Sequence, residues 1–192
     1  MRIIGGVASG IRLTAPEGRD VRPTEDRVKE SMFGTVGDLT GKTVVDLFSG
    51  TGALGLEALS RGAARVVLVE RENAHVEYIR RNLAAVLKSM NHQAGKVEIL
   101  CQDVKTAHTQ LSLLAGTVDF VFADPPYNPA PGGYGGPELL RDEQFAAWAL
   151  PGTILVLEHA SANVMPWTPA SPWRPLRERQ YGIRAVSFAA RA

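Results

Sequence analysis

Apolar and polar positions follow a regular order through the middle of the chain, where short apolar runs alternate with longer amphipathic segments. The apolar runs, rich in β-branched residues, lie at 43–48, 65–69, 97–101, 118–123 and 153–157. In the segments between them apolar residues recur at helical spacing, and the longest such segment begins near Asn73. Short β-branched runs are typical of buried parallel strands, and their alternation with helices predicts an α/β fold with a parallel sheet covered on both faces.

The two ends of the chain depart from this alternation. Two short apolar pieces within residues 2–14 are separated by glycines, which predicts a β-hairpin. A helix with Thr24 at its N-cap is predicted to follow. Residues 174–180 and 183–188 lie too close together for a helical crossover, so we expect an antiparallel hairpin that turns near Tyr181-Gly182.

The first apolar run of the central region leads into Gly50-Thr51-Gly52-Ala53-Leu54-Gly55. Glycines let the backbone turn sharply and approach a ligand closely. This segment satisfies Gly-x-Gly-x-x-Gly, and Glu70 stands where a ribose-binding acid is expected, so an NAD enzyme is one interpretation. However, Asp46 lies beside the glycines, where an acid repels a pyrophosphate and attracts a cationic cofactor. This favours S-adenosylmethionine.

A second motif, Asp124-Pro125-Pro126-Tyr127, ends the fourth apolar run. The exocyclic amine of a nucleobase is a poor nucleophile because its lone pair is delocalised into the ring. Asp124 and the carbonyl of Pro125 could accept its two N–H groups and stabilise the developing positive charge, while Tyr127 could stack on the base. The motif therefore predicts methyl transfer to a base that has left its stack, although a proline-rich turn that caps a strand is the alternative.

Composition adds constraints on compartment and partners. The net charge is only +1, but residues 43–173 carry nine Lys and Arg against thirteen Asp and Glu, so the ends of the chain are the more basic parts. The single cysteine, Cys101, lies in an apolar run and is interpreted as a small core residue. The chain has neither a signal-peptide pattern nor a long apolar segment, so we expect a cytoplasmic protein without a membrane partner. The four histidines show no metal-ligand spacing, so we expect no metal.

Together these motifs resemble class I S-adenosylmethionine-dependent methyltransferases, and more closely the RsmD-like family, which methylates a guanine N2 in bacterial 16S ribosomal RNA. The resemblance covers nearly the whole chain. Its segments are Arg2-Ile3-Ile4-Gly5-Gly6, Arg22-Pro23-Thr24-x-x-Arg27-Val28-x-Glu30, the glycine-rich run from Asp46 to Ala63, Asp124-Pro125-Pro126-Tyr127 and Tyr181-Gly182.

The resemblance implies a Rossmann-like α/β fold with a mostly parallel seven-stranded sheet, helices on both faces, an antiparallel C-terminal strand and an N-terminal β-hairpin extension. Residues 1–23 would form an RNA-binding appendage and residues 24–192 the methyltransferase domain. The cofactor would be S-adenosylmethionine, with S-adenosylhomocysteine as product. The partner would be 16S ribosomal RNA or a small-subunit ribonucleoprotein, and we expect a monomer.

The resemblance also implies roles for three sets of residues. The cofactor would be bound by Asp46, Phe48, Gly50, Gly52, Glu70, Gln102 and Asp103. The catalytic residues would be Asp124, Pro125, Pro126 and Tyr127. The RNA would be contacted by Arg2, Arg12, Arg22, Thr24 and Arg27. Two alternatives remain open. The first is an adenine-N6 methyltransferase acting on DNA or RNA, since the tetrad Asp124-Pro125-Pro126-Tyr127 suits any exocyclic amine. The second is a catalytically idle RNA-binding assembly factor.

Overall fold

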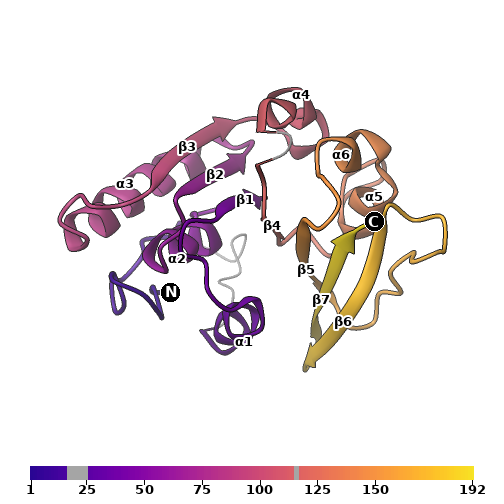
Figure 1. Cartoon of the computed structure of the whole chain (residues 1–192), viewed down its shortest axis with the longest axis horizontal. Coiled ribbons are helices and arrows are strands. Elements are labelled where there is room, and N and C mark those ends of the chain that lie inside the picture. Colours follow the sequence, from indigo (N-terminus) through magenta and orange to yellow (C-terminus); the bar gives the residue numbers. More distant parts are fainter. Residues whose placement is uncertain (17–25, 115–116) are drawn as a thin grey trace.

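The centre of the molecule is a seven-stranded sheet with strand order β3-β2-β1-β4-β5-β7-β6 (Figure 1). The computed structural model describes residues 1–16, 26–114 and 117–192. The strands are β1 Thr43–Leu47, β2 Arg65–Glu70, β3 Lys96–Cys101, β4 Phe120–Ala123, β5 Ile154–Ala160, β6 Trp173–Tyr181 and β7 Arg184–Arg191. β1 to β5 pair in parallel, whereas β7 runs antiparallel to both β5 and β6. The predicted mostly parallel seven-stranded sheet and its antiparallel C-terminal hairpin are confirmed.

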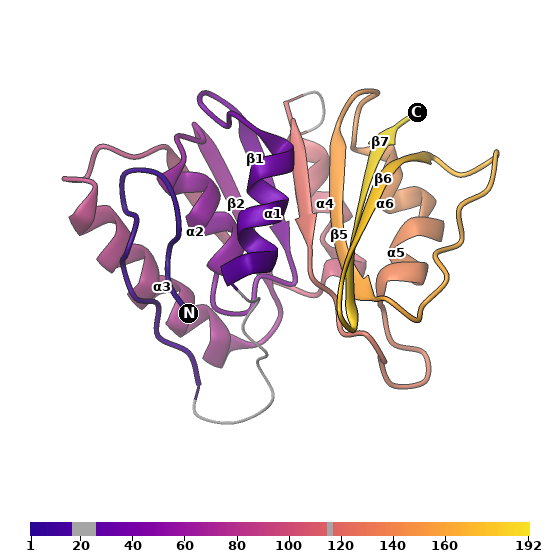
Figure 2. The same cartoon turned by 90° about the horizontal axis from the view of Figure 1, so that it is seen from below.

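Helices cover both faces of this sheet, as predicted. Figures 1 and 2 show α4, α5 and α6 on one side of the strands and α1 and α2 on the other. The α-helices are α1 Asp26–Val36, α2 Ala53–Ser60, α3 Asn73–Ser89, α4 His108–Leu111, α5 Gly136–Arg141 and α6 Glu143–Ala147, and the 3-10 turns η1 Val104–Thr106 and η2 Ser112–Leu114 flank α4. Side chains alternate across a strand, so Val44 packs into the core on the α1–α3 side and Val45 into the core on the other. Because helices cover both faces of the sheet, side chains that point to either face are buried, which explains the nearly continuous apolar runs in the sequence.

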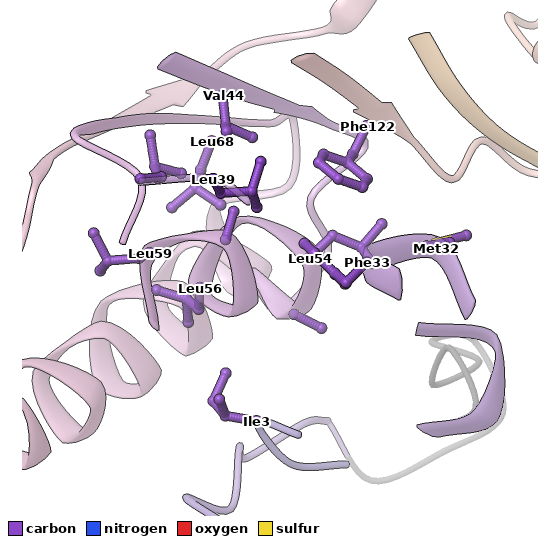
Figure 3. Close-up of a cluster of buried hydrophobic side chains, with 14 of the residues drawn as sticks. Ile3, Met32, Phe33, Leu39, Val44, Leu54, Leu56, Leu59, Leu68 and Phe122 are labelled. Carbon is purple, nitrogen blue, oxygen red and sulfur yellow. The ribbon is translucent and has the colours of Figure 1, made fainter. Parts of the chain in front are cut away.

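The N-terminal residues form a narrow hairpin that packs on α2. Arg2 and Arg12 make an isolated antiparallel bridge, and Ile3 is fully buried. Figure 3 shows Ile3 on the side of α2 away from the sheet. Every residue of α2 is buried, because the hairpin covers the side that the sheet leaves open. The hairpin is therefore part of the packed core, and its role as an RNA-binding appendage stays a prediction.

The hairpin is hydrogen-bonded to α2 and approaches it so closely that Gly6 is required. The buried carboxylate of Glu57 accepts the backbone N–H groups of Ile4 and Gly5, each at 2.8 Å. Gly6 has a φ of 76°, and a Cβ at this position would lie 1.9 Å from the backbone oxygen of Ser60. Only glycine permits this approach.

Two further observations complete the fold. The interpretation of Cys101 as a core residue is wrong: Cys101 is exposed, because β3 is an edge strand and Cys101 is its last residue. The predicted helix start at Thr24 and the connector from 17 to 23 lie outside the described residues. None of the helices that the structure describes is long and apolar enough to cross a lipid bilayer.

Candidate active site

The predicted cofactor and catalytic residues gather at the carboxyl edge of the sheet. Leu47, the last residue of β1, pairs with Val69 of β2 on one side and with Ala123 of β4 on the other. Glu70 pairs with Cys101 at the end of β3. Parallel strands end at the same edge, so the segments after β1, β2, β3 and β4 become neighbours there. This is the lower edge of the sheet in Figure 2.

The glycine loop after β1 is a tight turn. Gly50 and Gly52 have φ values of 55° and 83°, in the left-handed region, and the Gly52 N–H donates to the Ser49 carbonyl at 2.7 Å. Phe48 also has a positive φ of 56°, which costs about 1–2 kcal/mol for a residue with a side chain. The third glycine of the motif, Gly55, lets α2 approach the sheet: a Cβ there would lie 2.5 Å from the side chain of Leu68.

Asp46 lies beneath this loop. Its carboxylate is buried and accepts the backbone N–H of Gly55 at 2.8 Å, which fixes the first turn of α2. Burial raises the pKa of Asp46 to about 7; the hydrogen bond from Gly55 opposes the rise in pKa and the negative charge of Glu70 adds to it. The structure thus gives Asp46 a definite supporting contact, whereas its contact with a cofactor stays a prediction.

Glu70 connects the glycine loop with the segment after β2. One carboxylate oxygen accepts the N–H of Gly50 at 2.8 Å, and the other accepts the N–H of Glu72 at the same distance. The backbone N–H of Gln102 donates to the Glu70 carbonyl at 2.9 Å. Asp103 follows and caps η1 by accepting the N–H of Lys105. Glu70, Gln102 and Asp103 are therefore brought together beside the glycine loop.

The segment Asp124-Pro125-Pro126-Tyr127 is held in place by residues that the sequence did not single out. The hydroxyl of Tyr127 donates to Glu158 of β5 at 2.6 Å, and the Tyr127 carbonyl accepts the side-chain N–H of Asn163 at 3.3 Å. Glu158 is fully buried and forms an ion pair with Arg184 of β7 at 3.0 Å. Burial, followed by the hydrogen bond to Glu158, raises the pKa of Tyr127, so its hydroxyl keeps its proton and donates.

Within the tetrad, burial differs from residue to residue. Pro125 is buried, Asp124 and Tyr127 are half-buried, and Pro126 is exposed. The sequence carries one signal for the missed residue Glu158: an acid follows directly after the apolar residues of 154–157.

The loop at 128–135, which precedes α5, reaches back to the glycine loop. The ring of Tyr134 stacks on Phe48, with 6.4 Å between ring centroids, and its hydroxyl donates to Asp142 at 2.7 Å. Asp142 also caps α6 by accepting the N–H of Phe145. Tyr134 therefore connects the segment after β4 with the glycine loop after β1, a contact that the sequence did not reveal.

The predicted RNA-binding residues fall into two places. Arg2 and Arg12 are exposed neighbours on the N-terminal hairpin, where Arg2 forms an ion pair with Asp26 at 2.9 Å. Arg27 is exposed on α1 and lines a pocket shared with the β6–β7 turn. Arg22 and Thr24 lie outside the described residues. Among the residues placed by the structure, no group of three or more His, Cys, Asp or Glu side chains could hold a metal ion.

Comparisons with known proteins concern the family and the fold of the chain. A family model described as conserved hypothetical protein 95 matches residues 1–190. Ribosomal RNA small subunit methyltransferase D of Escherichia coli is 34% identical over 190 residues, which cover 95% of this chain and 85% of that protein. The solved structure of the Escherichia coli protein yhhF superposes with a TM-score of 0.73 at 30% identity, covering 100% of this chain and 97% of that one.

A more distant structure shares the fold. The RNA methyltransferase from Salinibacter ruber, solved with S-adenosyl-L-homocysteine, has a TM-score of 0.64 at 19% identity and covers 88% of this chain and 93% of its own. The predicted class I methyltransferase fold and the resemblance to the RsmD-like family are confirmed by these matches.

Proposed function

The chain belongs to the family described as conserved hypothetical protein 95. From this premise we propose that it transfers a methyl group from S-adenosylmethionine to the exocyclic N2 of a guanine in bacterial 16S ribosomal RNA. The observation that carries the proposal is the tetrad: Tyr127 is anchored to the buried Glu158, and its loop is connected by Tyr134 to the glycine loop. The name of the Escherichia coli relative supports ribosomal RNA as the substrate class.

The residues at the edge of the sheet fit the proposed cofactor. A tight glycine loop, with the carboxylate of Glu70 beside it and the buried carboxyl group of Asp46 beneath it, provides close backbone approach and, through Glu70, negative charge for a cationic ligand. Phe48, Gly50 and Gly52 would line the methionine end, and Glu70 would accept the ribose hydroxyls. Gln102 and Asp103 would lie beside the adenine. When bound, S-adenosylmethionine supplies an electrophilic methyl group.

The tetrad would orient the guanine amine. Asp124 would accept one N–H and the carbonyl of Pro125 the other, so that the nitrogen lone pair points toward the methyl donor. Asp124 would also stabilise the positive charge that develops on the nitrogen and receive the proton that the amine loses. Tyr127, held by Glu158, would present its ring to the base.

Exposed arginines would bind the RNA backbone. Arg2, Arg12 and Arg27 are all exposed, and guanidinium groups form strong bidentate contacts with phosphate. Arg22 and Thr24 remain candidates for the same role. The partner would be 16S ribosomal RNA, alone or within a small-subunit ribonucleoprotein.

The proposal is tested with methyl-labelled S-adenosylmethionine and 16S ribosomal RNA from cells that lack the enzyme. We expect N2-methylguanosine after nuclease digestion and mass spectrometry, and no label after the substitution Asp124→Ala. Asp38→Asn is a matched control, because Asp38 lies before β1 at the opposite edge of the sheet. Label found in N6-methyladenosine would instead favour the adenine-N6 alternative. Full complementation in cells by Asp124→Ala would favour the idle assembly factor.

A further inference from the structure

A basic pocket lies between α1 and the turn that joins β6 and β7. Its volume is about 540 Å³, within the roughly 300–1,000 Å³ of ordinary ligand sites. Arg27 lines it from α1, and Tyr181, Ile183 and Arg184 line it from the hairpin. Among the described residues, the charged side chains of this lining are Arg27 and Arg184. Arg184 is paired with Glu158, so Arg27 is the cation that suits the pocket to an anionic ligand.

This pocket adjoins the tetrad through Arg184. In the antiparallel pairing of β5 with β7, Arg184 lies opposite Ala160, the last residue of β5, so the hairpin turn is at the carboxyl edge of the sheet (Figure 2). Arg184 forms an ion pair with Glu158, which also accepts the hydroxyl of Tyr127. One carboxylate therefore connects the pocket wall with the catalytic loop.

The pocket wall is tied to α1, so the pocket is already formed in the protein alone. The hydroxyl of Tyr181 is hydrogen-bonded to Ser31 of α1, and Arg179 of β6 donates to the same Ser31 oxygen at 3.4 Å. A further hollow of about 440 Å³ continues along α1, and Arg27 lines both. At the tip of the hairpin, the apolar side chain of Ile183 is 69% exposed.

We propose that this pocket binds an RNA nucleotide that flanks the target guanine. A base enters a methylation site only after it leaves its stack, and its neighbours in the strand must then be held at the edge of the site. Arg27 binds the phosphate of the flanking nucleotide, and Ile183 contacts the base that the departing guanine leaves unstacked. The inference rests on the proposed function, because it takes the tetrad as the place where the target base is bound.

The test uses in vitro transcribed 16S ribosomal RNA, which carries no methyl groups, in filter binding over a range of salt concentrations. Loss of one phosphate contact predicts about a tenfold higher Kd for Arg27→Ala. The slope of log K against log salt falls by about 0.7–0.9. Arg27→Lys keeps the slope, because it keeps the charge. Ile183→Asp raises both Kd and the KM for RNA.

The matched control is Arg174→Ala, an exposed arginine near the start of β6, at the end of that strand opposite to the pocket. It should leave Kd unchanged. S-adenosylmethionine affinity, measured by calorimetry, should be unchanged in every variant, which shows that the fold is intact.

The outcomes separate this inference from the proposed function. Wild-type Kd and salt slope in Arg27→Ala would overturn the inference, and so would an equal loss of affinity in Arg174→Ala. Weakened binding in Arg27→Ala and Ile183→Asp, together with absence of methyl transfer by the wild-type protein, would support the pocket and contradict the proposed function.

Discussion

Glu158 is a buried carboxylate that contacts both Tyr127 and Arg184, and the substitution Glu158→Gln tests how much its charge contributes to stability. Glutamine keeps an oxygen that can accept the Tyr127 hydroxyl but removes the negative charge opposite Arg184. The side chain of Arg184 is only 12% exposed, so water compensates little for the loss. Removing one partner of a buried ion pair costs about 3–5 kcal/mol, and we expect the lower end, about 3 kcal/mol, because glutamine still accepts the Tyr127 hydroxyl.

The assay is urea unfolding of the wild-type protein, Glu158→Gln, Arg184→Met and the double variant. Each single variant should lose stability, and the double variant should lose less than the sum, with a coupling energy of about 1–3 kcal/mol. Strictly additive losses would refute the reasoning. Glu77→Gln is the control, because Glu77 pairs with Arg80 in an exposed ion pair and should change stability by less than about 1 kcal/mol.

The variant Glu158→Gln also tests whether Glu158 matters for methyl transfer. With the carboxylate gone, Tyr127 and its loop are held less firmly, so kcat for methyl transfer should fall several-fold. Cofactor affinity should not change, because the glycine loop and Glu70 are untouched. A wild-type kcat in Glu158→Gln would show that the negative charge of Glu158 does not matter for the reaction.

Three further predictions concern the other parts of the fold and site. Burial raises the pKa of Asp46 from 3.8 to about 7, so the folded state keeps a proton that the unfolded chain loses, and unfolding free energy should fall by up to about 4 kcal/mol as pH rises from about 4 to 7. Asp46→Asn should flatten this part of the curve in urea unfolding, and an unchanged curve would contradict the prediction. Gly6→Ala should lower the unfolding free energy by more than about 2 kcal/mol in thermal unfolding, and Gly10→Ala by only about 1 kcal/mol. Both glycines have a positive φ, but a Cβ at Gly10 meets no atom within 4 Å. Equal losses of unfolding free energy would argue against the steric explanation. Tyr134→Ala should weaken S-adenosylmethionine binding in calorimetry while Tyr134→Phe does not, because the ring that stacks on Phe48 is kept; equal affinities would show that the stacking is irrelevant.

The sequence by itself determined the features that depend on short stretches of chain. Alternation of apolar runs and helical segments is a local pattern, and it predicted the sheet and the helices on both faces. The glycine loop and the tetrad are likewise contiguous, and both end a parallel strand, so their meeting at one edge followed from the predicted fold. The terminal hairpin at Tyr181-Gly182 was predicted because its strands are too close in sequence for any other connection.

Only the tertiary structure decided which distant residues complete the site. Glu158 lies 31 residues from Tyr127 and 26 from Arg184, and the contacts form because β5 lies between β4 and β7 in the sheet. Strand order also makes β3 an edge strand, which exposes Cys101 although its apolar neighbours suggested burial. A local pattern reports that a segment is a strand, but not which strands lie beside it. The tertiary arrangement alone therefore determined the anchorage of Tyr127, the packing of the N-terminal hairpin on α2 and the pocket beside Arg27.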